Sequence, residues 1–243
     1  MKQPHLRVDK GEVNDYCLIV GRPERVDVIM KLLDKAEKVS VNRGYIIANG
    51  EYKGVPVTIC NTGIGGPSAA VAIEELINVG AKTIIRAGSC GMLQKGMKTG
   101  DLVISTGVCK EEDSTLAYER YEFAAVPNYD VLNALINSAR ESGKKFHYGL
   151  TMCTDAFYSK SHREQMMEWS KRGVLASDME SSMLFILARL RGVRAGFIAY
   201  GGLNIAEKQT HKDIIKQEKE RRRGEKNAIM VALNAIKKLE EVG

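Results

Sequence analysis

The sequence predicts a single α/β domain, residues 1–243, built on a mixed, largely parallel central β-sheet flanked by helices. Two observations lead to this prediction. Apolar, β-branched runs alternate with segments of helical periodicity, which is the pattern of parallel strands joined by helices. The chain of 243 residues is also 44% apolar, which is enough to enclose one sizeable core. No obvious repeat or low-complexity stretch divides it.

The first half of the chain alternates strands with helices. Strands are expected over residues 16–20, 55–60, 83–87 and 101–106. Helices are expected over residues 23–34 and 67–79. Proline suits the first turn of a helix, which places the two starts at Pro23 and Pro67, and Gly80 ends the second helix. Glycine-containing turns follow three of the strands, at Gly21, Gly63 and Gly88.

The second half continues the same alternation. Helices are expected over residues 128–142, 159–171, 178–190 and 210–240, and strands over residues 147–151 and 193–200. Asn128 is a favourable N-cap, and Ser177 or Asp178 caps the third of these helices. Ligands of such sheets bind at the carboxyl ends of strands. The turns that follow the strands are therefore the places where a site is expected.

Composition and charge exclude several classes of protein. No apolar run approaches the roughly 18 residues of a membrane span, and the polar N-terminus has no signal-peptide core, so we expect a cytoplasmic protein with no membrane partner. The five cysteines form no CxxC pair, and we expect no metal site. The net charge of +6 is spread along the chain, which fits a small anionic ligand as well as it fits nucleic acid. The basic run 219–223 is interspersed with acids and is expected to be a solvated helix face, so we expect no nucleic-acid partner.

The turns after two strands carry arginine. Gly21 lets a ligand approach the backbone, and the helix that follows offers free N–H groups to an anion. Arg25 lies one turn into that helix, while Arg86 and Ser89 lie at the end of the strand 83–87. Two arginines, a hydroxyl and backbone amides make a suitable phosphate site. The alternative is that both arginines are surface or ion-pairing residues.

Other motifs allow a structural or a functional interpretation. There is no GxxxxGK[ST] P-loop, and residues 63–66 lack the third glycine of a dinucleotide fingerprint, which favours a tight turn. Residues 87–91 differ by one substitution from the G-x-S-x-G motif of a nucleophile elbow. A serine hydrolase, with Ser89 as its nucleophile, is therefore an alternative. Glu180 either stabilises the start of a helix or accepts hydrogen bonds from sugar hydroxyls. Phe157 either packs in the core or stacks on a planar base.

Four motifs in a fixed order give the chain a resemblance to the nucleoside phosphorylase family of hexameric uridine and purine nucleoside phosphorylases. They are NTGIGGPSAA at 61–70 with Glu74-Glu75-Leu76 after it, IRAGSCG at 85–91, DAFY at 155–158 and DMES at 178–181. The resemblance runs from about Pro4 to Gly202. It implies phosphorolysis of a nucleoside's N-glycosidic bond, which yields ribose 1-phosphate and the free base. It implies no cofactor, with inorganic phosphate as co-substrate.

The resemblance also implies a role for individual residues. The phosphate-binding residues would be Gly21, Arg25, Arg43, Arg86 and Ser89. The ribose-binding residues would be His5, Met179 and Glu180. The base-binding residues would be Cys90, Gly91, Phe157, Ser161 and Arg163. Catalysis would rest on Arg86, Glu180 and Arg163. His5 and Arg43 would enter the neighbouring subunit's site, so the protein would be a homo-oligomer with sites built by dimers, and the family commonly forms hexamers.

The chain departs from the family pattern at several positions. Arg22 stands where the family usually has aspartate. No aspartate lies within residues 200–204, where purine phosphorylases usually protonate the base, which argues against cleavage of 6-aminopurine nucleosides. Of the glutamine and arginine with which uridine phosphorylases bind uracil, the first is Ser161 and only Arg163 is kept. Gly44 replaces a glutamate that helps some relatives hold potassium, so no such ion is expected.

Taken together, the sequence predicts a cytoplasmic nucleoside phosphorylase of nucleoside salvage that acts on uridine. The alternatives are a purine nucleoside phosphorylase that prefers inosine or guanosine, a non-catalytic nucleoside-binding relative, and the serine hydrolase. Nucleosidases of the same family use water in place of phosphate. They lack the phosphate-binding arginines that this chain has at Arg25, Arg43 and Arg86.

Overall fold

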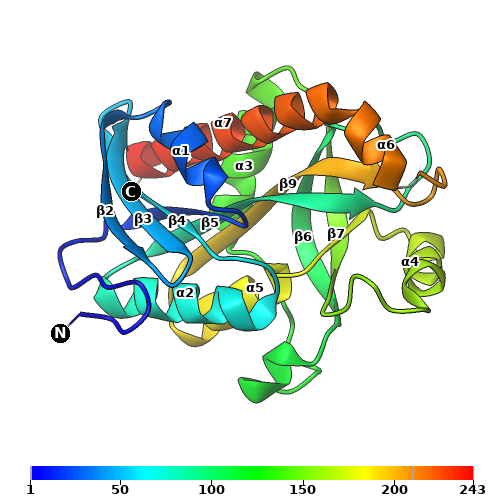
Figure 1. The fold of residues 1–243 in the computed structure, drawn as a ribbon, viewed down its shortest axis with the longest axis horizontal. Helices are drawn as coiled ribbons and strands as arrows, with labels where there is room; N and C mark the ends of the chain where they lie inside the picture. The colour runs from blue at the N-terminus through cyan, green and yellow to red at the C-terminus, as the bar shows by residue number, and fades with distance from the viewer. Residues whose placement is uncertain (1, 210, 243) are drawn as a thin grey trace.

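The computed structural model describes residues 2–209 and 211–242 (Figure 1). Within these residues the strands are β1 (Tyr16–Val20), β2 (Asp34–Asn42), β3 (Tyr45–Tyr52), β4 (Val55–Asn61), β5 (Thr83–Met92), β6 (Leu102–Glu111), β7 (Phe146–Thr154), β8 (Ala176–Asp178) and β9 (Arg194–Asn204). The helices are α1 (Glu24–Met30), α2 (Gly66–Val79), the 3-10 helix η1 (Ser114–Ala117), α3 (Tyr129–Glu141), α4 (His162–Lys171), α5 (Ser181–Leu190), α6 (His211–Lys216) and α7 (Glu218–Val242).

The strands form one mixed sheet in the order β2-β3-β4-β1-β5-β8-β7-β6-β9, with an additional pairing of β5 to β9. Because β5 pairs with both β8 and β9, the strands β5, β8, β7, β6 and β9 close into a ring, and β1 to β4 extend from it. The central strand β1 pairs in parallel with β4 and β5, and β5 pairs in parallel with β9. The predicted fold class, a mixed sheet with a parallel centre, is therefore confirmed.

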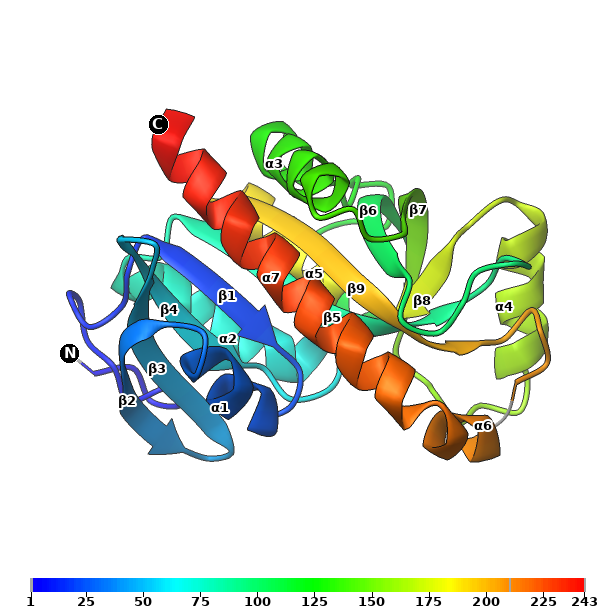
Figure 2. The same cartoon turned by 90° about the horizontal axis from the view of Figure 1, so that it is seen from above.

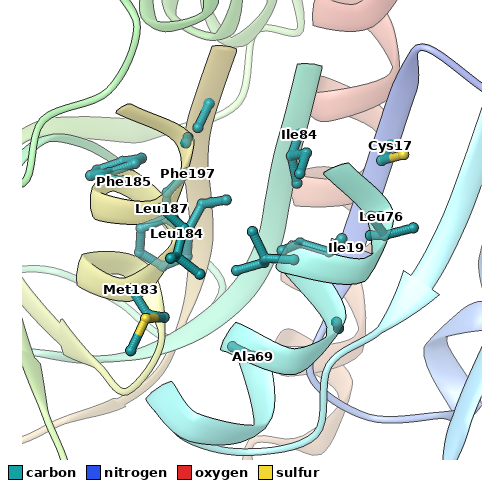
Figure 3. Close-up of a cluster of buried hydrophobic side chains, with 14 of the residues drawn as sticks. Cys17, Ile19, Ala69, Leu76, Ile84, Met183, Leu184, Phe185, Leu187 and Phe197 are labelled. Atoms are coloured by element: carbon teal, nitrogen blue, oxygen red, sulfur yellow. The ribbon is translucent and has the colours of Figure 1, made fainter. Parts of the chain in front are cut away.

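Helices cover both faces of the sheet. α7 runs diagonally across the central strands, with α1 and α3 on the same face, whereas α2 and α5 lie on the opposite face (Figures 1 and 2). Below the sheet, apolar residues of α5 pack toward β5 and β9 through Leu184, Ile84 and Phe197 (Figure 3). Above the sheet, a second cluster of buried apolar side chains includes the predicted apolar stripe of α7. The four residues of this stripe are all buried: Ile229, Leu233, Ile236 and Leu239.

Several predicted elements agree with the structure. The first strand, the helix α2 and the helix α3 lie where they were expected. The Asn128 side chain accepts hydrogen bonds from the backbone N–H groups of Asp130 and Val131, so it is the N-cap that the sequence indicated. Gly80 ends α2 with a φ of 125°, a conformation that favours glycine.

Other boundaries were wrong. The first helix ends at Met30 instead of Asp34, where the strand β2 begins, and β2 and β3 were not foreseen. Residues 88–91, expected as a turn, continue β5 to Met92, because they pair in register with β9. The last helix is divided into α6 and α7 at Gln217. Its predicted start, Thr210, lies outside the described residues.

Candidate active site

The site begins where the parallel strands β1 and β4 end beside β5. The turns after β1 and β4 are joined, because Gly63 N donates a hydrogen bond to Gly21 O at 2.9 Å. A Cβ at Gly21 would lie 3.6 Å from Gly63 O and 3.9 Å from Arg86 Nη2. The Arg86 guanidinium therefore lies against the backbone of Gly21. The structure brings together two predicted phosphate-binding residues that are far apart along the chain.

Arg86 lies in a buried cluster of charged groups. Its side chain is 4% exposed, and its Nη2 donates to Glu180 Oε2. Its Nε is 3.7 Å from Asp178 Oδ2. Within the described part of the chain, Nε and Nη1 have no hydrogen-bond acceptor. A buried guanidinium with unused donors is suited to bind an anion, because donors left unpaired away from water cost free energy.

Glu180 is held between α2 and β5. Its Oε1 accepts a hydrogen bond of 2.8 Å from Gly65 N, at the start of α2. Its carboxylate therefore connects the glycine-rich turn to Arg86. It does not cap its own helix through its side chain. The neighbouring Met179, the other predicted ribose-binding residue on this segment, is half-buried.

Asp178 is a buried acid that the sequence did not assign to the site. Its carboxylate accepts hydrogen bonds from Glu180 N at 3.3 Å and Ser181 N at 3.0 Å, so it holds the turn before α5. The helix was expected to begin at residue 178 with Ser177 or Asp178 as its cap; it begins at Ser181, and its N-cap is Glu180, because Asp178 is still part of β8. Burial, and then the nearby Glu180 charge, raise the pKa of Asp178 to about 6, although Arg86 opposes the shift. The cluster thus contains two carboxylates for one guanidinium, and the raised pKa means that Asp178 binds a proton more readily than an exposed acid would.

Arg25 is held by a different carboxylate. Its side chain is 5% exposed, its Nε donates to Glu225 Oε2 at 2.9 Å, and its Nη2 donates to Tyr200 Oη at 2.9 Å. Arg22 Nη2 donates to the same Glu225 oxygen at 2.6 Å. Glu225 therefore connects two arginines of the Gly21–Arg25 turn to α7. Arg22, which departs from the family pattern, has a carboxylate partner 203 positions away.

Ser89 and Cys90 follow Arg86 along β5. Ser89 is half-buried and lies in register with Tyr200 of β9. Cys90 is buried, and its Sγ donates to Tyr200 O at 3.6 Å. Burial raises the pKa of the Cys90 thiol, so this cysteine remains protonated at neutral pH. The register places Ser89 beside Tyr200, whose hydroxyl contacts Arg25.

Two of the predicted base-binding residues, Gly91 and Arg163, contact Ile205, just beyond β9. Arg163 Nη2 donates to Ile205 O at 3.1 Å. A Cβ at Gly91 would lie 3.0 Å from Ile205 Cδ1. Phe157 is 42% exposed, and its ring centroid is 5.5 Å from that of His162. Ser161 is exposed and makes no side-chain cap hydrogen bond at the start of α4. Gly91 and Arg163 are thus brought together, while Phe157 and Ser161 lie on the loop that precedes α4.

His5 and Arg43 lie far from this end of the molecule. His5 Nδ1 is 2.7 Å from Glu75 Oε1, and His5 O accepts a hydrogen bond of 2.8 Å from Asn42 Nδ2. Arg43 is exposed in the turn between β2 and β3, on the opposite side of the molecule from α4 (Figure 1). Asn42 thus connects His5 to the turn that carries Arg43. The structure brings these two residues close to each other and not to Arg163 of the same chain.

A cavity of about 520 Å³ lies beside His5. Pro67 and Glu75 of α2, Ser114 of η1 and Met183 of α5 contribute to its wall. It is separate from the Arg86 cluster, because neither Arg86 nor Glu180 lines it. The surface around His5 is therefore hollow.

Three contributors to the site were missed by sequence reasoning: Gly65, Asp178 and Glu225. Gly65 and Asp178 lie inside motifs that were recognised, but their contacts to Glu180 and Arg86 depend on the pairing of β5 with β8. Glu225 gave no local signal, because an acid within a charged helix is common. Its partners are 200 and 203 positions away.

The described residues contain no group of three or more His, Cys, Asp or Glu side chains arranged to hold a metal ion. No helix in the described part of the chain is long and apolar enough to cross a membrane. All five cysteines are free thiols, and four of them are buried.

The chain matches the phosphorylase superfamily over residues 15–237. It is 43% identical over 238 residues to the guanosine phosphorylase of Halorubrum lacusprofundi, which covers 97% of this chain and 98% of that protein. It is 37% identical over 251 residues to the uridine phosphorylase of Thermococcus kodakarensis, which covers 98% of this chain and 87% of that protein. The crystal structure of uridine phosphorylase from Vibrio fischeri ES114 superposes with a TM-score of 0.92, at 34% identity and 98% coverage of both chains.

The match spans the whole sheet, from just before β1 to within α7, and includes the Arg86, Glu180 and Glu225 positions. The relatives are similar over nearly their full length, and the structural similarity extends over 98% of the chain. The chain belongs to the phosphorylase superfamily.

Proposed function

We propose that the protein is a nucleoside phosphorylase, which cleaves the N-glycosidic bond of a nucleoside with inorganic phosphate. One observation carries the proposal. The buried Arg86 lies against Gly21 and is paired with Glu180, and two of its guanidinium nitrogens have no acceptor among the described residues. A cation for phosphate and a carboxylate for sugar hydroxyls are thus in contact. Membership of the phosphorylase superfamily supports the proposal.

The reaction requires little covalent chemistry from the protein. A phosphate oxygen forms a bond to C1′ of the ribose while the C1′–N bond breaks, and the electron pair of that bond stays on the base nitrogen. Monohydrogen phosphate brings the proton that balances the one taken up by the leaving base. Arg86 positions the phosphate, and Glu180 orients the sugar by accepting its hydroxyl hydrogens. The developing positive charge on the ribose is stabilised by the phosphate beneath it.

The phosphate site is completed by residues of the two turns. Gly21 and Ser89 supply small groups beside the guanidinium, and Arg25 supplies a second cation when it exchanges Glu225 or Tyr200 for phosphate. Met179 packs against the ribose. Cys90, Gly91, Phe157, Ser161 and Arg163 form the base site. No cofactor takes part, and phosphate is the co-substrate.

Uridine is the first candidate substrate, because Arg163 is retained near Gly91 and uridine phosphorylases are among the relatives. Guanosine is the second, and a specific observation favours it: a guanosine phosphorylase is 43% identical to this chain, whereas the uridine phosphorylase of Thermococcus kodakarensis is 37% identical. Both bases carry carbonyl oxygens, and neither is a 6-aminopurine, the class of base that the aspartate missing from residues 200–204 argues against.

We also propose that each site is shared by two subunits, as in a dimer or a hexamer assembled from dimers. His5 and Arg43 lie together, away from Arg163, and a cavity beside His5 offers room for a neighbouring chain. We place the protein in the cytoplasm, because its five free cysteines suit a reducing compartment.

Base release from uridine, guanosine, inosine and adenosine, each with and without phosphate, tests this function. We expect phosphate-dependent release from uridine or guanosine and little from adenosine. Arg86→Met is expected to lower kcat/KM for phosphate by about 100-fold, the usual loss for a donor that stabilises developing charge. The matched control is Arg189→Met, an exposed arginine of α5. Release that does not require phosphate would identify a nucleosidase, and no release from any nucleoside would favour a binding protein.

A further inference from the structure

Asp178 is a buried acid beside Arg86 that the proposed mechanism does not use. The side chains of Arg86, Asp178 and Glu180 are 4%, 1% and 6% exposed, so water screens their charges little. One guanidinium faces two carboxylates, and the three groups together carry a net negative charge when all are ionised. Because Arg86 is already paired with Glu180, the excess negative charge lies on Asp178.

One of the unpaired donors of Arg86 faces Asp178. Its Nε is 3.7 Å from Asp178 Oδ2, which is too far for a hydrogen bond. Nε and Nη1 have no acceptor within the part of the chain that the structure describes. A phosphate held by these two donors would bring its oxygens next to the Asp178 carboxylate. Like charges repel strongly in a buried site, so phosphate and an ionised Asp178 disfavour one another.

The hydrogen bonds around Asp178 suit either state of its carboxyl group. Oδ2 accepts from the N–H groups of Glu180 at 3.3 Å and Ser181 at 3.0 Å. Oδ1 accepts from the Ser181 hydroxyl, and a hydroxyl can accept as well as donate. A proton on Oδ1 can therefore be donated to Ser181 Oγ while both hydrogen bonds to Oδ2 remain. The neutral acid requires no rearrangement of the backbone.

Among the described residues, the charged and titratable groups that face Asp178 come from three segments. β5 contributes Arg86 and Cys90, β7 contributes Cys153, and the turn before α5 contributes Glu180. Burial raises the pKa of both thiols, so they stay protonated at neutral pH. Glu180 is held as an acceptor by Arg86 and by the backbone at the start of α2. Asp178 is therefore the group whose protonation balances a new negative charge.

We propose that Asp178 takes up a proton from solvent when phosphate binds to Arg86 and returns it when ribose 1-phosphate leaves. This inference rests on the proposed nucleoside phosphorylase function and adds the pH regulation of its phosphate site. Asp178 is a positioning residue, because the neutral acid leaves Arg86 to the phosphate and does not itself touch the substrate. Burial, and then the Glu180 charge, raise the pKa of Asp178 to about 6. Above that pH each bound phosphate requires a proton from solution, so binding weakens as the pH rises.

The test uses sulfate, an analogue of the phosphate dianion whose own charge does not change over the range of pH used. Calorimetric titration gives the Kd of sulfate from about pH 5 to about pH 8. Uptake of a full proton makes the Kd rise about tenfold for each unit of pH. We therefore expect the wild-type Kd to rise at least about tenfold between about pH 6 and about pH 8. In Asp178→Asn, whose amide is neutral at every pH, the Kd is expected to stay nearly constant.

The number of protons is measured directly by titrations at neutral pH in two buffers of different ionisation enthalpy. We expect nearly one proton per sulfate in the wild type and none in Asp178→Asn. Arg86→Met should abolish sulfate binding, which locates the anion. The matched control is Asp130→Asn, an exposed acid of α3, which should keep the wild-type dependence on pH.

A second variant preserves the test should Asp178→Asn fold poorly. Burial raises the pKa of Asp178, and the hydrogen bond from the Ser181 hydroxyl opposes that shift. Ser181→Ala removes the hydroxyl, so the pKa of Asp178 should rise further. The increase in the Kd of sulfate should then begin at a higher pH than in the wild type.

The outcomes separate this inference from the proposed function. A Kd that rises equally with pH in wild type and Asp178→Asn would overturn the inference, as would a wild-type Kd that does not change with pH or sulfate that fails to bind. Phosphate-dependent base release without proton uptake on sulfate binding would leave the proposed function intact and remove the inference. Proton uptake at Asp178 in a protein that releases no base would support the proton-linked anion site and overturn the proposed function.

Discussion

The two buried arginines near the predicted phosphate site are both paired with carboxylates of distant segments. Arg86 pairs with Glu180, and Arg25 pairs with Glu225. Removal of one partner would leave a buried charge uncompensated, which costs more free energy than the pair contributes. Phosphate binding would therefore involve charges that are already desolvated, and the arginines need not be stripped of water when the substrate arrives.

Asp178 makes the stability of the protein depend on pH. Its pKa is raised from 3.8 to about 6 by burial and by Glu180. A raised pKa means that the folded state binds the proton more tightly than the unfolded state. The contribution of this group to stability is therefore fully present below pH 3.8 and is lost as the pH rises through about 6.

We therefore expect Asp178→Asn to remove this loss. The Tm of the variant relative to wild type should rise as the pH is raised from about 4 to about 7, whatever constant cost arises from weaker hydrogen bonds to the N–H groups of Glu180 and Ser181. Thermal unfolding across this range measures it, with Asp130→Asn, an exposed acid of α3, as the control. A difference in Tm that does not change with pH would contradict the assignment.

At the scale of elements, α7 is the helix that holds Arg22 and Arg25 in place through Glu225. It packs on β9 and the turn before β6 through Gly224, where no side chain fits. In a helix interior, alanine is usually more stable than glycine by about 1 kcal/mol. Here the added methyl would meet the Gly100 backbone, which cannot move aside as a flexible side chain could.

We therefore expect Gly224→Ala to destabilise the protein by about 1–3 kcal/mol, the usual cost of overpacking, in spite of the better helix propensity. Denaturant unfolding measures it. Lys226→Ala, an exposed position on the same helix, is the control and should be near neutral. An increase in stability on Gly224→Ala would show that α7 does not pack in this way.

The elements that the sequence revealed are those with strong local patterns. β1 is apolar throughout, α2 has proline and glycine at its ends, and α3 has a capping asparagine. β2 was not predicted, because most of its side chains are polar and at least partly exposed, so it has no apolar pattern. β3 contains Asn49-Gly50, which is typical of a turn. β8 has three residues and is too short for any periodicity.

The same limit applies to the site. Arg86 and Ser89 could be located from the sequence, because they follow a strand of the parallel sheet. The contacts of Arg22 and Arg25 with Glu225 could not, because they depend on how α7 crosses the sheet (Figure 2). The resemblance to a family gave individual residues their candidate roles. The structure shows which side chains hold those residues in position.

At the scale of the whole molecule, one chain holds its candidate residues in two separate places. His5 and Arg43 lie on the side of β2 and β3, whereas Arg163 lies on α4 at the other end (Figure 1). A closed dimer with twofold symmetry would bring the first group of one chain to the second group of its partner. A shared site of this kind predicts complementation between variants.

Arg43→Ala and Arg86→Met are each expected to be impaired when pure. Mixed dimers formed by refolding the two together should regain activity, because one of their two sites contains both wild-type residues. Base release before and after co-refolding measures this, and refolded single variants serve as controls. Mixed oligomers with no more activity than the single variants would contradict a shared site.

The central claim is that phosphate, held by Arg86, is itself the nucleophile. The most direct measurement is phosphorus NMR of the products formed from the preferred nucleoside and phosphate labelled with ¹⁸O at all four oxygens. The account predicts ribose 1-phosphate that retains all of the label, because the bond to C1′ is formed by a phosphate oxygen. Free ribose carrying a solvent oxygen, with the labelled phosphate unconsumed, would contradict it.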